Sequence, residues 1–98
     1  MTPEHKEKLI INRKVLVENI SVKYIYTYLQ ENIFTTRELD DIKAQSTTQE
    51  SVEELLDILA RKSDEAYWKF IDILRKSGQE HVANELESNN SIINKTSN

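Results

Sequence analysis

Glycine and proline, the residues that most often interrupt regular structure, are almost absent from this chain. Its 98 residues include one glycine, Gly78, and one proline, Pro3. A β-rich fold of this length needs several tight turns, and those turns usually need glycine or proline at fixed positions. The near absence of both therefore favours an all-α fold, and it constrains the chain more than any motif does.

Apolar residues recur at helical spacing from the start of the chain. Pro3 suits the first turn of a helix, because its missing N–H would have no partner there. The predicted inward side of this first helix contains Leu9, Ile10, Leu16, Val17 and Ile20. Its basic residues are predicted to lie mostly on the other flanks: Lys6, Lys8, Arg13 and Lys14. Asn12 interrupts the middle of this helix, and we expect a bend there.

Two shorter helices are predicted next, each starting at a polar residue that can cap it. Ser21 is the expected cap of a helix that ends near residue 31, with an inward side of Val22, Ile25 and Leu29. Thr35 and Glu38 form a capping box ahead of a helix over residues 37–43. In that helix Leu39 and Ile42 are predicted to point inward, and Asp40 and Asp41 away from the core.

Three more helices are predicted in the second half. A second capping box, Thr47 and Glu50, precedes the clearest helical pattern in the chain: Val52, Leu55, Leu56 and Leu59. Ser63 is the expected cap of a fifth helix that ends at Gly78, with an inward side of Ala66, Tyr67, Phe70, Ile73 and Leu74. A sixth helix over residues 79–87 presents Val82, Ala83 and Leu86.

One domain over residues 1–87 is therefore expected, as an antiparallel bundle of six helices. Residues 88–98 are rich in Ser, Asn and Thr, and we expect a flexible tail or the start of a linker. The absence of cysteine removes disulfides and thiolate metal sites, so the cytoplasm is the expected location. No apolar run is long enough to span a membrane.

Charge and motifs point to a protein partner and away from chemistry. Thirteen basic and seventeen acidic residues give a net charge of −4, so the basic field that nucleic-acid binding usually needs is missing. His5 and His81 show no ligand-like spacing to carboxylates, so no metal or other cofactor is expected. No nucleophile elbow or phosphate loop occurs, and we expect no enzymatic activity.

Three stretches of the chain resemble caspase recruitment domains (CARDs), which are members of the death-fold superfamily. "LIINRKVLVENI" and "KYIYTYLQENIFT" are similar to the first two helices of apoptosome adaptors and initiator caspases, in which the first helix is bent. "ELLDILARKSDEAYWKFIDILRKSGQEHVANEL" resembles the last three helices of initiator caspase CARDs. The resemblance covers residues 4–87 and implies a left-handed or Greek-key-like six-helix death fold with a bent first helix.

In this family, a basic face on helices 1 and 4 meets an acidic face on helices 2 and 3 of another CARD. The resemblance places Arg13 at the key basic position, with Lys14 beside it, and Asp40 and Asp41 at acidic positions of helix 3. Glu53 stands on helix 4 where a basic residue would be expected, so the basic face is weakened. Glu38 completes the set of six candidate interaction residues.

The resemblance implies a homotypic interaction module that recruits or assembles apoptotic or inflammatory signalling proteins, with another CARD as partner and self-assembly as a further option. Such a domain belongs either to a caspase as its prodomain, to an adaptor, or to a CARD-only regulator that competes for binding. An unrelated helical oligomerisation domain is a further alternative. Arg13, Asp40 and Asp41 are either interface residues or solvated charges, and Trp68 is either a binding hot spot or edge-of-core packing.

Overall fold

The computed structural model describes the backbone of residues 1–95 and, within that range, the side chains outside residues 30–32 and 88–95. That described part is helical and contains no strand. Its helices are α1 (Pro3–Ile11), α2 (Arg13–Asn19), α3 (Val22–Asn32), α4 (Thr36–Lys43), α5 (Thr48–Ala60), α6 (Asp64–Lys76) and α7 (Glu80–Lys95). The predicted all-α fold is confirmed, and the seven helices correspond to the predicted six with the first divided in two.

Asn12 divides the first helix at the predicted bend. It has φ −94° and ψ 5°, outside the helical region, and it separates α1 from α2. Its side-chain Nδ2 donates a hydrogen bond of 2.9 Å to the carbonyl oxygen of Lys8, which also accepts the Asn12 backbone N–H at 3.0 Å. A side chain bonded to the carbonyl four residues earlier competes with the backbone and bends a helix.

Polar caps start three of the later helices as predicted. The Thr35 hydroxyl accepts from the Glu38 N–H and the Glu38 carboxylate accepts from the Thr35 N–H, which completes the capping box. The Thr47 hydroxyl accepts from the N–H of Glu50, and the Ser63 hydroxyl accepts from that of Ala66. Ser21 also takes the predicted N-cap position, that of α3, but its side chain makes no capping hydrogen bond to the helix.

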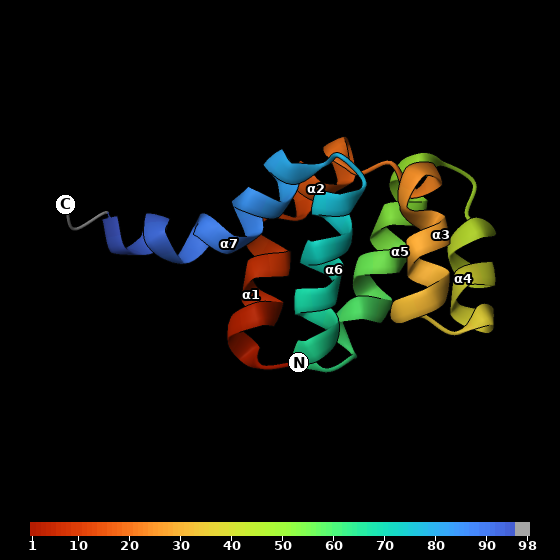
Figure 1. Ribbon diagram of the computed structural model, residues 1–98, viewed down its shortest axis with the longest axis horizontal. Coiled ribbons are helices and arrows are strands. Elements are labelled where there is room, and N and C mark those ends of the chain that lie inside the picture. Colours follow the sequence, from red (N-terminus) through yellow and green to blue (C-terminus); the bar gives the residue numbers. More distant parts are fainter. Residues whose placement is uncertain (96–98) are drawn as a thin grey trace.

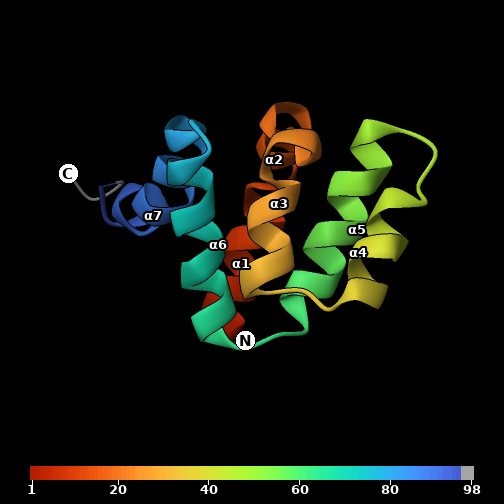
Figure 2. The same cartoon turned by 45° about the vertical axis from the view of Figure 1, so that its right-hand side comes forward.

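The helices pack side by side around one core (Figures 1 and 2). α6 contacts α3 on one side and α7 on another, while α5 contacts both α2 and α4. α4 forms one edge of the bundle in both views. Because α5 lies against α2 and α4, it separates the surface of the bent first helix from that of α4.

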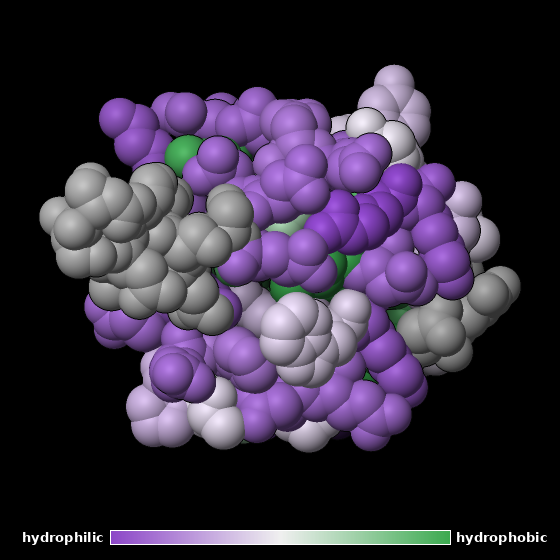
Figure 3. Space-filling model, turned by 60° about the vertical axis from the view of Figure 1, so that its left-hand side comes forward, coloured by the Kyte–Doolittle hydropathy of each residue, from purple (hydrophilic) through white to green (hydrophobic). Residues whose placement is uncertain are grey.

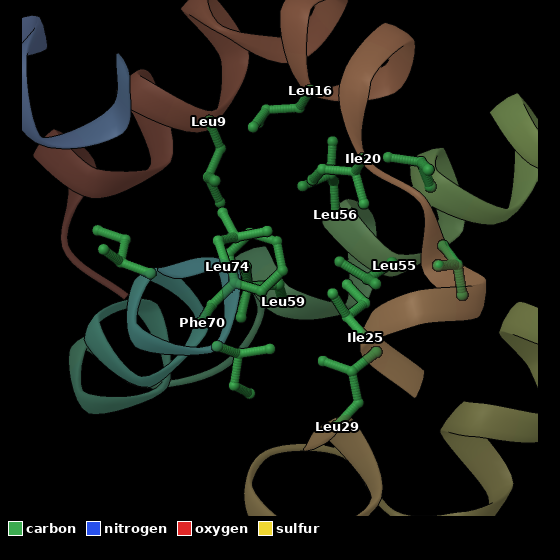
Figure 4. Close-up of a cluster of buried hydrophobic side chains, with 14 of the residues drawn as sticks. Leu9, Leu16, Ile20, Ile25, Leu29, Leu55, Leu56, Leu59, Phe70 and Leu74 are labelled. Atoms are coloured by element: carbon green, nitrogen blue, oxygen red, sulfur yellow. The ribbon is translucent and has the colours of Figure 1, made fainter. Parts of the chain in front are cut away.

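Leucine and isoleucine side chains from α1, α2, α3, α5 and α6 converge in the core (Figure 4). Nearly all residues predicted to point inward are buried, and many of them have no exposed surface, among them Leu16, Ile25, Leu55, Leu59 and Phe70. Phe34, Ile58 and Ile71 are also buried, although the patterns did not single them out. Phe34 lies between α3 and α4, and it reaches the core from that loop.

Two predictions for the first helix are wrong: Ile10 does not point inward, and Lys8 does not lie on an exposed flank. Ile10 is 64% exposed, whereas Lys8 is only 5% exposed. Residues of a helix follow one another at about 100°, and buried Lys8, Leu9, Asn12 and Leu16 together define an inward side that lies away from Ile10. The polar Asn12 and Lys8 thus turn the helix relative to its purely apolar pattern.

The backbone of α7 is helical to Lys95, eight residues beyond the predicted end of the last helix. We predicted a flexible tail over residues 88–98. The side chains of residues 88–95 and the whole of residues 96–98 lie outside the described part of the chain, so the flexible tail stays a prediction. Within the described part, no helix is both long enough and apolar enough to cross a membrane.

Candidate protein-interaction surfaces

Arg13, the first residue of α2, reaches across to α5. Its Nη1 lies 3.2 Å from Oδ1 of Asp57, and its Nη2 donates to the backbone carbonyl of Glu53 at 3.4 Å. The Arg13 side chain is 37% exposed and that of Asp57 is 54% exposed. The guanidinium at the predicted key basic position therefore already has a partner within its own chain, although such an exposed ion pair is weak.

A groove lies between the bent first helix and the first half of α5. It measures about 560 Å³ and its lining is Ile10, Ile11, Arg13, Lys14, Val17, Glu18, Gln49 and Glu53. We call it the isoleucine groove. Three of the six predicted interaction residues, Arg13, Lys14 and Glu53, thus meet at one place. Lys14 and Glu53 are exposed, and neither makes an ion pair within the described residues.

The exposed isoleucines of this groove are residues that sequence reasoning missed. Ile10 is 64% exposed and Ile11 is 51% exposed, and the other large exposed apolar residues of the described chain are Tyr24 and Trp68. The face drawn in Figure 3 is hydrophilic over most of its area, with hydrophobic residues in small patches only. In the sequence, Asn12 beside the pair was the signal from which their exposure could have been predicted, because burial of Asn12 turns both isoleucines outward.

Asp40 and Asp41 lie together on the exposed side of α4, as predicted. Leu39 and Ile42, on either side of them in sequence, are buried and fix α4 to the core. Neither aspartate carboxylate makes a hydrogen bond or ion pair with another described residue. Lys43 of the same helix lies instead over the ring of Tyr26, with Nζ 5.0 Å from the ring centre. The two carboxylates are therefore available on a rigid helix.

Glu38, the third predicted residue of α4, is occupied within the fold. Its Oε1 lies 2.8 Å from Nζ of Lys62, and its carboxylate also accepts the Thr35 N–H at 3.0 Å. Partial burial raises the pKa of this carboxyl, but the hydrogen bonds from Lys62 and Thr35 and the Lys62 charge together hold the pKa below its ordinary value. Glu38 thus fixes α4 to the segment between α5 and α6.

The isoleucine groove and the acidic surface of α4 lie on different sides of α5. The isoleucine groove is formed by α1, α2 and α5, whereas Asp40 and Asp41 belong to α4, which packs against α5 from another side. The six predicted residues therefore do not form one site. Arg13, Lys14 and Glu53 gather at the groove, and Glu38, Asp40 and Asp41 gather on α4.

His5, Asp64, Tyr67 and Trp68 form a separate cluster that joins α1 to α6. Nδ1 of His5 lies 2.8 Å from Oδ1 of Asp64, and the His5 ring stacks on Tyr67 with centres 4.2 Å apart. Trp68 meets both rings edge-on and is 46% exposed. Burial and the Glu87 charge raise the pKa of Tyr67 to about 12.

The described residues contain no group of three or more His, Asp or Glu side chains placed to hold a metal ion. His5 has a single carboxylate, Asp64, at bonding distance. This arrangement serves packing, because His5 is stacked on a buried ring and its Nδ1 is bonded to Asp64.

Comparison with known families gives one match that covers most of the chain. The model of the caspase recruitment domain family matches residues 6–89. The matched range begins in α1 and ends in α7, so it includes the bent first helix, the α4 surface and both walls of the isoleucine groove.

Proposed function

The chain belongs to the caspase recruitment domain family, and we propose that it docks on another CARD through the acidic surface of α4. CARDs are protein-interaction modules that bind other CARD or death-fold proteins in apoptotic or inflammatory signalling. In this chain, Asp40 and Asp41 would meet arginine or lysine residues on the basic face of the partner. Docking raises the local concentration of whatever is attached to each domain, and this drives assembly. We place this activity in the cytoplasm.

The free carboxylates of Asp40 and Asp41 are the observation that carries this proposal. Both are exposed on α4 and make no ion pair with other described residues, whereas Glu38 is bonded to Lys62. Buried Leu39 and Ile42 hold the helix in place, so little backbone ordering is needed on binding. An arginine can bind a carboxylate through two parallel hydrogen bonds, which gives geometric specificity.

Replacement of both aspartates tests the proposal. Asp40→Asn/Asp41→Asn keeps side-chain size and helix propensity while removing two charges. Two exposed ion pairs contribute about 0.4–2 kcal/mol, so affinity for a CARD with a basic first helix should fall by about 2- to 30-fold. Binding is measured by titration against a panel of purified CARDs that includes the chain itself.

The matched control is Glu7→Gln/Glu85→Gln, which removes two exposed charges from α1 and α7 that have no ion-pair partner among the described residues. This control should bind as the unaltered chain does. Equal affinity of the aspartate variant and the unaltered chain, for every CARD in the panel, would show that α4 is not the docking surface.

A second candidate function is a competitive regulator, and the Arg13–Asp57 ion pair favours it. A CARD with one available acidic surface, and a basic face on which Arg13 is bonded to Asp57 and Glu53 opposes Lys14, would bind an assembly at one side and block addition at the other. The two functions separate in a seeding experiment with an assembling CARD. A recruiting domain accelerates assembly and is incorporated, whereas a competitor shortens or slows it when present in less than equal amounts.

A further inference from the structure

Two adjacent isoleucines are exposed at the end of α1, on the wall of the isoleucine groove. Ile10 is 64% exposed and Ile11 is 51% exposed. With Val17 they give the side formed by α1 and α2 an apolar surface, while Gln49 and Glu53 line the α5 side. Exposed apolar residues scattered singly are ordinary, whereas neighbouring ones at a groove form an apolar patch, the type of surface found at interaction sites.

The charges around this groove differ from those of a basic docking face. The Arg13 guanidinium lies 3.2 Å from the Asp57 carboxylate, so these two charges largely offset each other. Lys14, Glu18 and Glu53 remain, and they sum to a formal charge of −1. Glu53 is exposed on the α5 wall, across the groove from the isoleucines. A ligand that complements this groove is therefore apolar on one side and basic on the other.

The walls of the groove also determine the backbone of the ligand. Both walls are helices, whose backbone N–H and C=O groups are bonded within each helix. They offer no strand edge to which an extended peptide could add. A ligand buried here must satisfy its own backbone hydrogen bonds, and a helix does so.

We propose that the isoleucine groove binds an amphipathic helix of a partner protein, with the apolar side of that helix over Ile10, Ile11 and Val17 and its lysine or arginine residues against Glu53. This site is independent of the α4 surface and does not rest on docking through Asp40 and Asp41. It also differs in kind, because apolar burial holds the ligand and the acidic wall orients it.

A designed peptide tests the groove directly. The probe is a helical peptide of about 18 residues, or five turns, with leucines on one side and lysines flanking them. A second peptide carries glutamate in place of every lysine. Both are titrated against the chain, and the methyl resonances of Ile10 and Ile11 are followed by NMR. The leucine–lysine peptide should shift these resonances and bind at least about tenfold more tightly than the leucine–glutamate peptide.

Variants of the two walls separate the apolar from the electrostatic contribution. Ile10→Ser/Ile11→Ser should weaken the leucine–lysine peptide at least about tenfold with little change in melting temperature, because both side chains are exposed. Tyr24→Ser, which alters an equally exposed residue elsewhere, should not. Glu53→Lys should weaken the leucine–lysine peptide and strengthen the leucine–glutamate peptide. Glu85→Lys makes the same change in net charge away from the groove and should alter neither.

Several results would overturn the proposal. These are absence of binding up to about 1 mM, equal binding of the two peptides, and equal losses in the variants and their controls. Self-association that the Ile10→Ser/Ile11→Ser variant abolishes would show that a second copy of the chain occupies the groove. Binding to anionic lipid vesicles through the isoleucines would likewise assign the groove to a membrane.

Discussion

Among the apolar residues of this chain, Leu55 is packed in the core and Ile10 is exposed on the surface. Leu55 has no exposed surface, whereas Ile10 is 64% exposed. Large-to-small changes in a core lose transfer free energy and leave a cavity. We therefore expect Leu55→Ala to lower the free energy of unfolding by about 2–5 kcal/mol and Ile10→Ala by less than about 0.5 kcal/mol. Urea denaturation of both variants measures this, and similar costs would contradict the assigned face of the first helix.

Glu38 predicts a dependence of stability on pH. Its folded pKa lies below the ordinary value, so folding favours the ionised form. The resulting stabilisation is present above the unfolded pKa, about 4.3 for glutamate, and is lost as pH falls through the folded pKa. The stability difference between the unaltered chain and Glu38→Gln should therefore shrink between about pH 5 and pH 3. A constant difference would exclude the Glu38–Lys62 ion pair as its source.

At the scale of single elements, Gly78 ends α6 by means of a conformation that other residues avoid. Its φ is +84°, and the N–H of Gln79 donates to the carbonyl of Leu74 at 2.8 Å, which closes the helix. A Cβ at this position would meet no atom within 4 Å, so only the backbone conformation opposes a larger residue. Gly78→Ala should destabilise the fold by about 1–2 kcal/mol, measured by thermal unfolding. Gly78→Asn is the control and should cost less, because asparagine tolerates this conformation better.

Elements could be predicted wherever their cause is local. The Thr35 and Glu38 capping box, the stop at Gly78 and the bend at Asn12 each depend on residues within one or two turns, and all three were readable from the sequence. Ser21 shows the limit of such reasoning. Its side chain does not cap α3, and its backbone N–H donates a hydrogen bond to the side chain of Gln79, which is 58 residues away in the chain.

The candidate site depends on the whole molecule, so only part of it could be predicted. Asp40 and Asp41 were placed correctly because the face of α4 follows from Leu39 and Ile42 beside them. The partner of Arg13 could not be found in the same way, because Asp57 lies 44 residues further along and approaches only when α2 packs on α5. The exposure of Ile10 likewise depends on which side of the bent helix meets the core.

The separation of the two surfaces by α5 leads to a prediction for the complete domain. A basic CARD on Asp40 and Asp41 and an amphipathic helix in the isoleucine groove should bind at the same time, since the two sites share no residue. The affinity of the leucine–lysine peptide should change by less than about twofold when a basic CARD saturates α4.

Salt should weaken the CARD complex more than the peptide complex, because exposed ion pairs are screened and apolar contacts are not. Asp40→Asn/Asp41→Asn should reduce only the first, and mutual exclusion of the two ligands would contradict the assignment of separate sites.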